Sequence, residues 1–238
     1  MDTPPMLLPF STNQAVASPS RQSGFTLVEL LAVIAIVATL SAILIPVVGH
    51  VRESAQASEC AGNLRQLGSA FLLYTSDHTG ALPTEHSTDE EKDAGNEWYY
   101  PNKLASYAPP ERWAIERHGN MRGGVWQCPS LDDDELSWGA GYGTNRSHVV
   151  LPMGDPVYLS QVTRPAEIVL IGDVWSRSRQ ASWISMVCPE CSNWGRSTEA
   201  NPLHGGKANM CFVDGHVEAI DYDDLADNKN DMFGHRHL

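Results

Sequence analysis

Residues 24–48 read GFTLVELLAVIAIVATLSAILIPVV, and this stretch decides how the rest of the chain is organised. From Leu30 to Val48 it contains no charged residue, and Thr39 and Ser41 are its only polar side chains. A helix needs about 20 such residues to cross ~30 Å of hydrocarbon, whereas the apolar region of a secretory signal has only about 7–15. We therefore predict a transmembrane helix over residues 25–48, with a buried core helix as the alternative.

One residue does not suit a simple membrane anchor. Glu29 lies inside the apolar stretch, where a carboxylate at the centre of a membrane helix costs about 2.5–3.5 kcal/mol. The nearest basic side chain upstream is that of Arg21. Cleavage between Gly24 and Phe25 would create an amino terminus about one helical turn from Glu29, and methylation would leave that amine cationic. In a stack of parallel helices the amine of one subunit would meet Glu29 of the next, so we expect Glu29 to set the register of assembly.

The residues Gly24–Leu30 resemble the processing site of type IV pilins and type II secretion pseudopilins, in which Gly, Phe or Met, Thr-Leu, an aliphatic residue and Glu precede an apolar helix. The resemblance implies that residues 1–24 are a leader peptide, that a prepilin peptidase cuts after Gly24, and that Phe25 is methylated. It also implies assembly with other pilin-like subunits through the N-terminal helix. The Lys and Arg residues near the predicted transmembrane helix do not indicate which of its ends faces the cytoplasm. The expected location, single-pass in the inner membrane with the globular domain extracytoplasmic, therefore comes from the resemblance.

Beyond Gly49 the pattern becomes that of an amphipathic helix, because small and apolar residues recur at steps of three and four. The members of this stripe are Val51, Ser54, Ser58, Ala61, Leu64, Leu67, Phe71 and Tyr74. The run Asp77–Gly80, followed by Pro83, predicts the end of the helix. Residues 49–78 are thus expected to continue the span, and residues 79–238 to form the globular domain.

The globular part contains four segments that are predicted to form strands. The segment 167–172 reads EIVLIG and is the clearest buried strand, and 125–129 is predicted to be a shorter one. Two β-prone segments, 208–213 and 216–220, flank Asp214-Gly215, which predicts a hairpin with a two-residue type I′ turn. The predicted fold class is α+β, with a long N-terminal transmembrane and amphipathic helix packed on a small antiparallel sheet, as in pilins.

A second resemblance concerns the carboxyl-terminal half. His204 and Asp214-Gly215 form a His-x9-Asp-Gly element, which is similar to that of a large bacterial group of pseudopilin-like proteins. We interpret the pair as structural, with Asp214 in its turn. The rival interpretation is a site built from Asp173, His204, Asp214 and His216, which could hold a metal or act as acid and base. No Gly-x-Ser-x-Gly or His-Glu-x-x-His motif is present, so we expect no enzymatic activity.

Five cysteines are present, and the sequence alone does not give their connectivity. Cys188 and Cys191 form a C-x-x-C, which suits half a zinc site, a redox pair or a local disulfide. Outside the cytoplasm a disulfide is the favoured state. We expect Cys60 to pair with Cys128 and Cys188 with Cys191, which leaves Cys211 as a free thiol.

The 238-residue chain has a formal net charge of −13, which argues against nucleic acid, because phosphate binding needs clustered Lys and Arg. Acidic clusters at 132–135 and 221–231 are interpreted as solvated surface, with a calcium site as the alternative. We expect no cofactor, while calcium or zinc stay open. The expected function is a structural subunit of a pilus-like or secretion machine. The alternatives are a membrane-tethered ligand-binding module and, after it, a metal-dependent enzyme.

Overall fold

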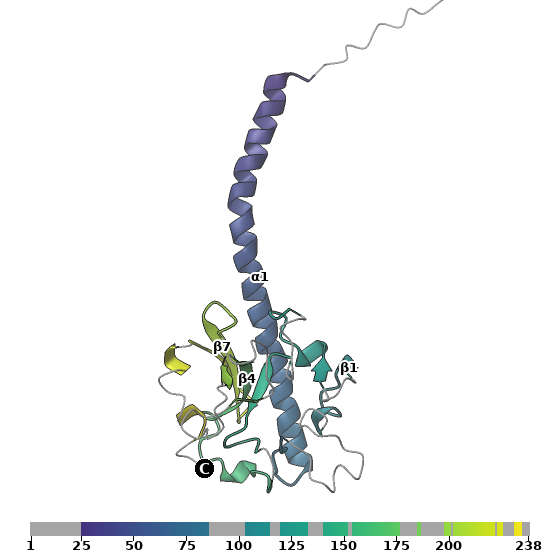
Figure 1. Ribbon diagram of the computed structural model, residues 1–238, viewed down its shortest axis with the longest axis vertical. Helices are drawn as coiled ribbons and strands as arrows, with labels where there is room; N and C mark the ends of the chain where they lie inside the picture. Colours follow the sequence, from purple (N-terminus) through teal and green to yellow (C-terminus); the bar gives the residue numbers. More distant parts are fainter. Residues whose placement is uncertain are drawn as a thin grey trace, which may run out of the picture. The chain divides into compact units, whose positions relative to one another are not determined.

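Figure 1 shows a computed structural model of the chain, which divides into two compact units, Met1–Pro46 and Val47–Leu238. The structure describes residues 25–85, 103–114, 120–132, 140–151, 154–176, 185–186, 198–200, 202–221, 223–225 and 231–234. The expected leader, residues 1–24, lies outside these ranges. Helix α1 spans Leu27–Asp77 and contains Pro46.

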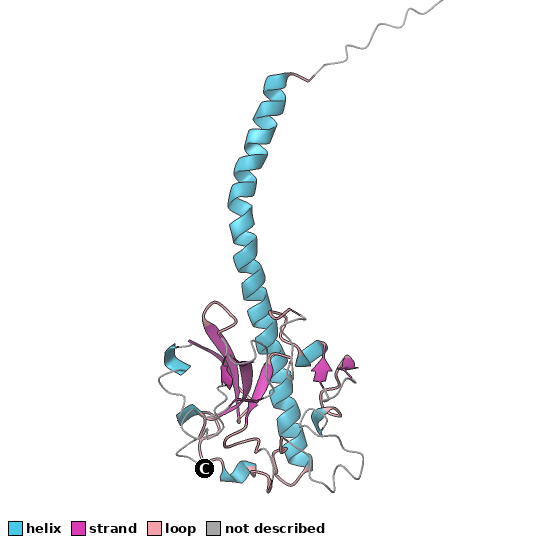
Figure 2. Cartoon of the chain, viewed as in Figure 1, coloured by secondary structure: helices cyan, strands magenta, loops and turns pink. Residues whose placement is uncertain are grey.

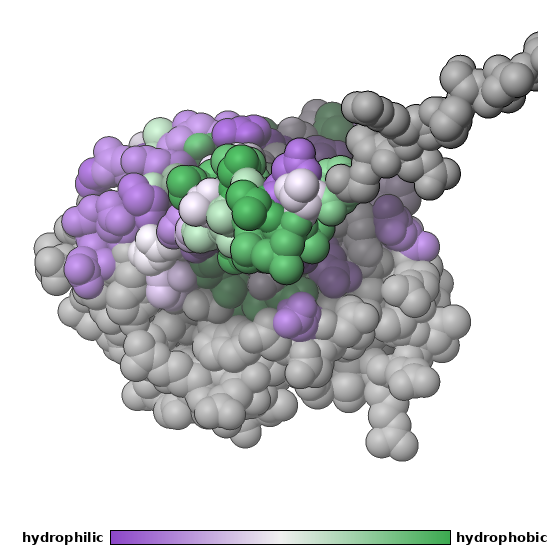
Figure 3. Space-filling view, turned by 90° about the horizontal axis from the view of Figure 1, so that it is seen from above, coloured by the Kyte–Doolittle hydropathy of each residue, from purple (hydrophilic) through white to green (hydrophobic). Residues whose placement is uncertain are grey.

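In the Met1–Pro46 unit the apolar side chains of α1 are exposed. The exposed fraction is 74% at Leu27, 55% at Ile34 and 67% at Ile43. Figure 3 looks onto the amino-terminal end of α1 and shows apolar residues gathered there. Within the described part of the chain, α1 is the one helix long and apolar enough to cross a membrane. A surface of this kind needs lipid or other protein to cover it.

In the Val47–Leu238 unit one face of α1 is buried. Its members are Cys60, Asn63, Leu64, Leu67, Gly68, Ala70, Phe71, Tyr74 and Thr75. The predicted stripe thus agrees with the buried face from Leu64 onward, whereas Val51, Ser54 and Ser58 are exposed. The burial begins about ten residues later than the pattern indicated, because no described segment covers the first turns after Gly49.

Helix α1 ends where the sequence predicted. Thr79 and Gly80 adopt positive φ angles of 55° and 91°. The Gly80 N–H donates to the Thr75 carbonyl over 2.8 Å, which is the long bond of a Schellman cap. The left-handed position is therefore taken by Thr79, although glycine is the usual residue there.

A mostly antiparallel sheet packs against α1 (Figure 2). Its strand order is β5–β3–β4–β7–β8, with β6 paired to β4 outside this path and β3–β5 as a parallel pair. The strands are β3 (Tyr142–Asn145), β4 (Val169–Ser176), β5 (Ser185–Met186), β6 (Thr198–Ala200), β7 (Lys207–Phe212) and β8 (Val217–Asp221). A separate pair comprises β1 (Arg112–Ala114) and β2 (Asn120–Arg122), and short 3₁₀ helices are η1 (Gly124–Trp126) and η2 (Leu159–Gln161). The α+β prediction is confirmed.

A bulge in β4 decides which way its later side chains point. The register of β4 against β7 shifts between Val169 and Ile171. An extra residue in one strand reverses the side to which the following side chains point. Val169 accordingly packs in a cluster that contains no residue of α1, whereas Ile171 joins the cluster beneath α1. Asp173, two residues further on, therefore faces α1.

The hairpin β7–β8 is present, but its turn differs from the predicted one. Phe212 and His216 are joined by a bond from the Phe212 N–H to the His216 carbonyl, and the Gly215 N–H donates to the Phe212 carbonyl, both over 2.9 Å. Gly215 has φ of 92°, while Asp214 is not among the described non-glycine residues with positive φ. A type I′ turn requires positive φ at both central residues. The loop is instead a three-residue one, with Gly215 in the left-handed position.

The predicted strand over residues 125–129 is wrong. Gly123 and Gly124 both have positive φ, 78° and 57°, and the chain then forms η1. Trp126 is buried, and its indole N–H donates to the Ala108 carbonyl over 2.7 Å. The glycine pair turns the chain out of the extended conformation before the apolar residues can pair as a strand.

Two glycines of α1 give a test of how closely the helix lies to β7. A Cβ on Gly68 would lie 2.5 Å from Cys211 Sγ, whereas no atom of the described residues lies within 4 Å of a Cβ on Gly62. We expect Gly68→Ala to lower the free energy of unfolding by about 1–3 kcal/mol through overpacking. Gly62→Ala should raise it by roughly 0.5–1 kcal/mol through helix propensity. Denaturant unfolding of the detergent-solubilised chain, followed by tryptophan fluorescence, measures both.

The contact between position 68 and Cys211 is tested in the Cys211→Ala variant. There Gly68→Ala should lower the free energy of unfolding by less, because the sulfur that would clash with the new Cβ is gone. An unchanged cost there would contradict the packing described.

Glu85 makes the stability of the globular domain depend on pH. Its side chain is 1% exposed, and Arg146 Nε lies 2.8 Å from its Oε2. Burial raises the pKa of Glu85 from 4.5 to about 7, and the charge of Arg146 opposes this rise only in part. The folded chain therefore holds the Glu85 proton more tightly than the unfolded chain does. This contribution to stability is complete below pH 4.5 and is lost as the pH rises to about 7.

We expect the unfolding free energy of the parent, relative to Glu85→Gln, to fall by up to about 3 kcal/mol across this window. Urea unfolding at several pH values measures the difference. Glu167→Gln is the matched control, because Glu167 is exposed and should leave the profile unchanged. Parallel profiles for the parent and Glu85→Gln would refute the assignment.

Candidate functional site

Thr26 and Glu29 close the amino-terminal end of α1 with a reciprocal capping box. The Thr26 N–H and hydroxyl donate to Glu29 Oε2 over 2.9 and 2.7 Å, and the Glu29 N–H donates to Thr26 Oγ1 over 3.2 Å. These bonds satisfy donors that the first helical turn leaves unpaired. Phe25 precedes the box and is 78% exposed, while Gly24 lies outside the described residues. Sequence reasoning named Glu29 but missed Thr26, although Thr-x-x-Glu before an apolar run is the signature of this box.

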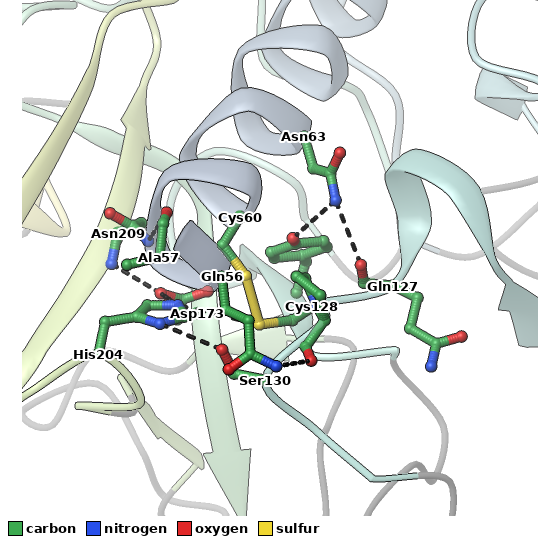
Figure 4. The surroundings of a disulfide bond; sticks show 12 residues. Gln56, Ala57, Cys60, Asn63, Gln127, Cys128, Ser130, Asp173, His204 and Asn209 are labelled. Atoms are coloured by element: carbon green, nitrogen blue, oxygen red, sulfur yellow. Dashed lines mark hydrogen bonds and ion pairs between the residues drawn. A yellow bond between two sulfur atoms is a disulfide. The ribbon is translucent and has the colours of Figure 1, made fainter. Parts of the chain in front are cut away.

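A second candidate site surrounds the disulfide that joins Cys60 to Cys128, the pair expected from the sequence (Figure 4). It ties α1 to the loop after η1, with 5.4 Å between the two Cα atoms. The side-chain amides of Gln56 and Asn63 donate to the carbonyls of the residues on either side of Cys128, over 2.8 and 3.3 Å. Because positions 56, 60 and 63 share one helix face, this face of α1 holds the loop at three successive points.

His204 is placed by a tight turn at the start of β7. Its backbone N–H and carbonyl both bond to Lys207, over 3.1 and 3.2 Å, and Gly205 and Gly206 have φ of 63° and 89°. Two successive positive φ angles are what a type I′ turn requires, so the glycine pair is needed here. The buried imidazole lies beside the disulfide, with Nε2 3.9 Å from Cys128 Sγ and Nδ1 3.3 Å from Ser130 Oγ.

Asp173 lies inside β4, three residues before its end, whereas the predicted strand over residues 167–172 would have left Asp173 just beyond its last residue. It is completely buried. Its Oδ2 accepts from the Asn209 N–H over 2.7 Å and lies 3.3 Å from His204 Nε2. Burial raises the pKa of Asp173, although the contacts with His204 and Asn209 oppose the rise. Its other oxygen, Oδ1, is buried without a hydrogen-bond partner among the described residues.

The four-residue site considered from the sequence is divided between two places. Asp173 and His204 lie together, as the rival interpretation required. Asp214 instead pairs with His216, with 2.6 Å between Asp214 Oδ1 and His216 Nδ1. Hydrogen bonds from the His216 backbone and ring lower the pKa of Asp214 despite the opposing effect of its partial burial. The structure thus gives Asp214 the turn-forming role that we had favoured.

Cys60 and Cys128 lie beside Asp173 and His204, where the rival interpretation placed Asp214 and His216. One potential ligand atom from each of four buried residues, Cys60, Cys128, Asp173 and His204, lies within 4.8 Å of the others. No other such group was found among the residues that the structure describes. Cys188 and Cys191 lie outside those residues, so their expected disulfide stays a prediction. Cys211 is a free, buried thiol.

The spacing between His204 and Asp214 follows from the hairpin. The residues between them comprise the Gly205-Gly206 turn, strand β7 and Val213. The His-x9-Asp-Gly element therefore has one strand between two turns: the first turn places His204 beside the disulfide, and the second is closed by Asp214. The two named residues act at opposite ends of β7 and form no common site.

Residues 19–45 match the family model of the prokaryotic N-terminal methylation motif. No curated protein and no solved structure matches the chain. The matched segment contains Phe25, the capping box of Thr26 and Glu29, and most of the exposed apolar part of α1. The motif and the membrane-capable helix together support a type IV pilin-like prepilin subunit, anchored in a membrane by this helix.

The cysteines provide a direct test of the second site. Burial raises the pKa of Cys211 to about 12, and the charge of Asp214 adds to the rise. We expect Cys211 to resist alkylation at neutral pH in the folded chain and to react after denaturation without reductant. Cys60 and Cys128 should react only after reduction. Peptide mass spectrometry measures each site, and labelling of Cys60 or Cys128 without reductant would contradict the disulfide.

Proposed function

We propose that the chain is a prepilin-type structural subunit of a pilus-like or type II secretion-like assembly, processed after Gly24 and methylated on the amine of Phe25. The observation that carries this proposal is the methylation motif at residues 19–45, set on a helix whose apolar side chains are exposed. A prepilin peptidase is the processing partner, and other pilin-like subunits are the partners in assembly.

The capping box supports a specific role for Glu29. Three hydrogen bonds join Glu29 to Thr26, two of them to Glu29 Oε2 and one from the Glu29 N–H. They remain after cleavage, because Thr26 keeps its amide bond to Phe25. The box therefore holds the carboxylate at the helix end beside the Thr26 N–H, although the backbone of Glu29 lies about 6 Å of helical rise from that of Phe25, which carries the new amine. A neighbouring subunit displaced along the helix axis would bring its own amine to this carboxylate, and the pairing offsets the cost of a charge in lipid.

The disulfide supports an extracytoplasmic position for the Val47–Leu238 unit. Disulfides form and persist in oxidising compartments and are rare in the cytosol. The Cys60–Cys128 bond closes a sequence separation of 68 residues within this unit. We accordingly place the protein in the inner membrane as a single-pass subunit, with the globular unit on the oxidising side. Its role there is structural and not enzymatic.

Three variants separate the charge of Glu29 from its capping bonds. Glu29→Gln keeps an acceptor for Thr26 but removes the charge, Glu29→Ala removes both, and Thr26→Ala removes the two bonds of the Thr26 hydroxyl but keeps the charge. We expect Glu29→Gln and Glu29→Ala to reduce recovery in cross-linked higher-order complexes by about tenfold or more, which corresponds to ~1.4 kcal/mol or more. Thr26→Ala should reduce the recovery in these complexes much less, because it keeps the charge of Glu29. The loss of one helix cap lowers helix stability by only about 1 kcal/mol.

Processing and folding are the controls. Cleavage after Gly24 should be followed by mass spectrometry in every variant, and the near-ultraviolet circular dichroism of the domain should match the parent. Normal assembly of a processed Glu29→Gln variant would contradict the proposal. It would leave the membrane-tethered ligand-binding module as the better account.

A further inference from the structure

The group of Cys60, Cys128, Asp173 and His204 draws its members from four separate places in the fold. Cys60 lies on α1, Cys128 in the loop after η1, Asp173 in β4, and His204 in the turn before β7. All four are buried, and one ligand atom of each lies within 4.8 Å of the others. Figure 4 shows His204 and Asp173 side by side against the disulfide. A disulfide that only joins two parts of the chain needs neither His204 nor Asp173 beside it.

We propose that, when the Cys60–Cys128 disulfide is reduced, the two sulfurs, His204 Nε2 and the Asp173 carboxylate bind one Zn²⁺ ion. Two thiolates, an imidazole and a carboxylate are a ligand set that zinc accepts in tetrahedral geometry. With bonds of about 2.0–2.3 Å, tetrahedral ligand atoms lie roughly 3.3–3.8 Å apart. The observed spacing within 4.8 Å needs only a modest contraction around the ion, together with separation of the two sulfurs. The site is independent of the function proposed for the amino-terminal helix.

The surroundings of the group are those of a metal centre. A ligating histidine commonly engages a polar group through its second nitrogen, and His204 Nδ1 lies 3.3 Å from Ser130 Oγ. A ligating carboxylate is commonly held by a hydrogen bond, and the Asn209 N–H donates to Asp173 Oδ2 over 2.7 Å. Asp173 Oδ1 is the independent indication of a ligand, because this buried oxygen has no hydrogen-bond partner in the described part of the chain. A bound cation would supply the missing partner.

The two states of the group exclude each other. A dithiol reductant gives two electrons and two protons to the sulfur–sulfur bond and itself becomes a disulfide. The two thiols then lose their protons as Zn²⁺ binds, and two thiolates, one carboxylate and the ion remain. In the oxidised chain both sulfurs of the group are held in the disulfide and neither is a thiolate, so the group does not hold zinc. Either state joins α1 to the loop and the sheet, so the domain keeps this link before and after oxidation.

The test uses the full-length chain in detergent, with Cys188→Ser and Cys191→Ser to remove the other cysteine pair. A phosphine reductant, which takes up oxygen from water as the disulfide becomes two thiols, is used without air. Co²⁺ serves as the probe, because tetrahedral thiolate coordination gives strong visible bands and a sulfur-to-metal band in the near ultraviolet. We expect one equivalent of Co²⁺ to bind the reduced chain, to be displaced by Zn²⁺, and not to bind the oxidised chain.

Substitutions locate the site. His204→Gln and Asp173→Asn should each weaken Co²⁺ binding by about 10-fold or more, whereas His216→Gln, in the turn at the opposite end of β7, should leave it unchanged. If reduction or a substitution unfolds the domain, added Zn²⁺ should restore the near-ultraviolet circular dichroism of the reduced parent but not of His204→Gln. A reduced chain that Zn²⁺ neither binds nor refolds overturns the proposal. So does equal binding by the oxidised chain or by His204→Gln.

Discussion

The apolar half of α1 imposes the constraint on which the rest of the structure depends. From Leu27 to Val48 its large side chains are exposed, and no element of the described chain covers them. Such a helix is stable only in lipid or against other helices of its kind. The same helix continues into the Val47–Leu238 unit, where a different face supplies core residues such as Leu64, Leu67 and Phe71. One continuous helix thus has exposed apolar side chains along its first half and a single buried face along its second half.

The second half of α1 is held by specific polar and covalent contacts as well as by burial. Gln56, Cys60 and Asn63 fasten the loop around Cys128, and the β4 bulge turns Asp173 to the same side of the sheet. A side chain as costly to bury as Asp173 is retained more readily when it has a task there. The group around the disulfide is therefore the part of the domain in which chemistry beyond packing is most strongly indicated.

Hydrophobic patterning predicted helix α1, the buried strand at 167–172 and the α+β class, and the β-prone segments that flank Asp214-Gly215 predicted the pairing of β7 with β8. The sequence-based predictions failed where backbone dihedral angles determine the local structure. The glycine pair at 123–124 replaced a predicted strand by η1, and a type I′ geometry occurs at Gly205-Gly206 and not at Asp214-Gly215. The bulge near Val169 leaves no mark in the hydrophobic pattern, so the sequence could not show that Asp173 faces Cys60. Only Thr26 had a readable signal that was overlooked, the Thr-x-x-Glu capping pattern.

Glu29 connects the fold to the proposed function, because its carboxylate stands at the start of an apolar helix next to the expected cleavage point. The most direct measurement is the amino-terminal residue of the protein extracted from its own membranes, determined by mass spectrometry of the terminal peptide. The account predicts a chain that begins with N-methylated Phe25. A mature chain that begins at Met1, or at a residue within the apolar stretch, would contradict it.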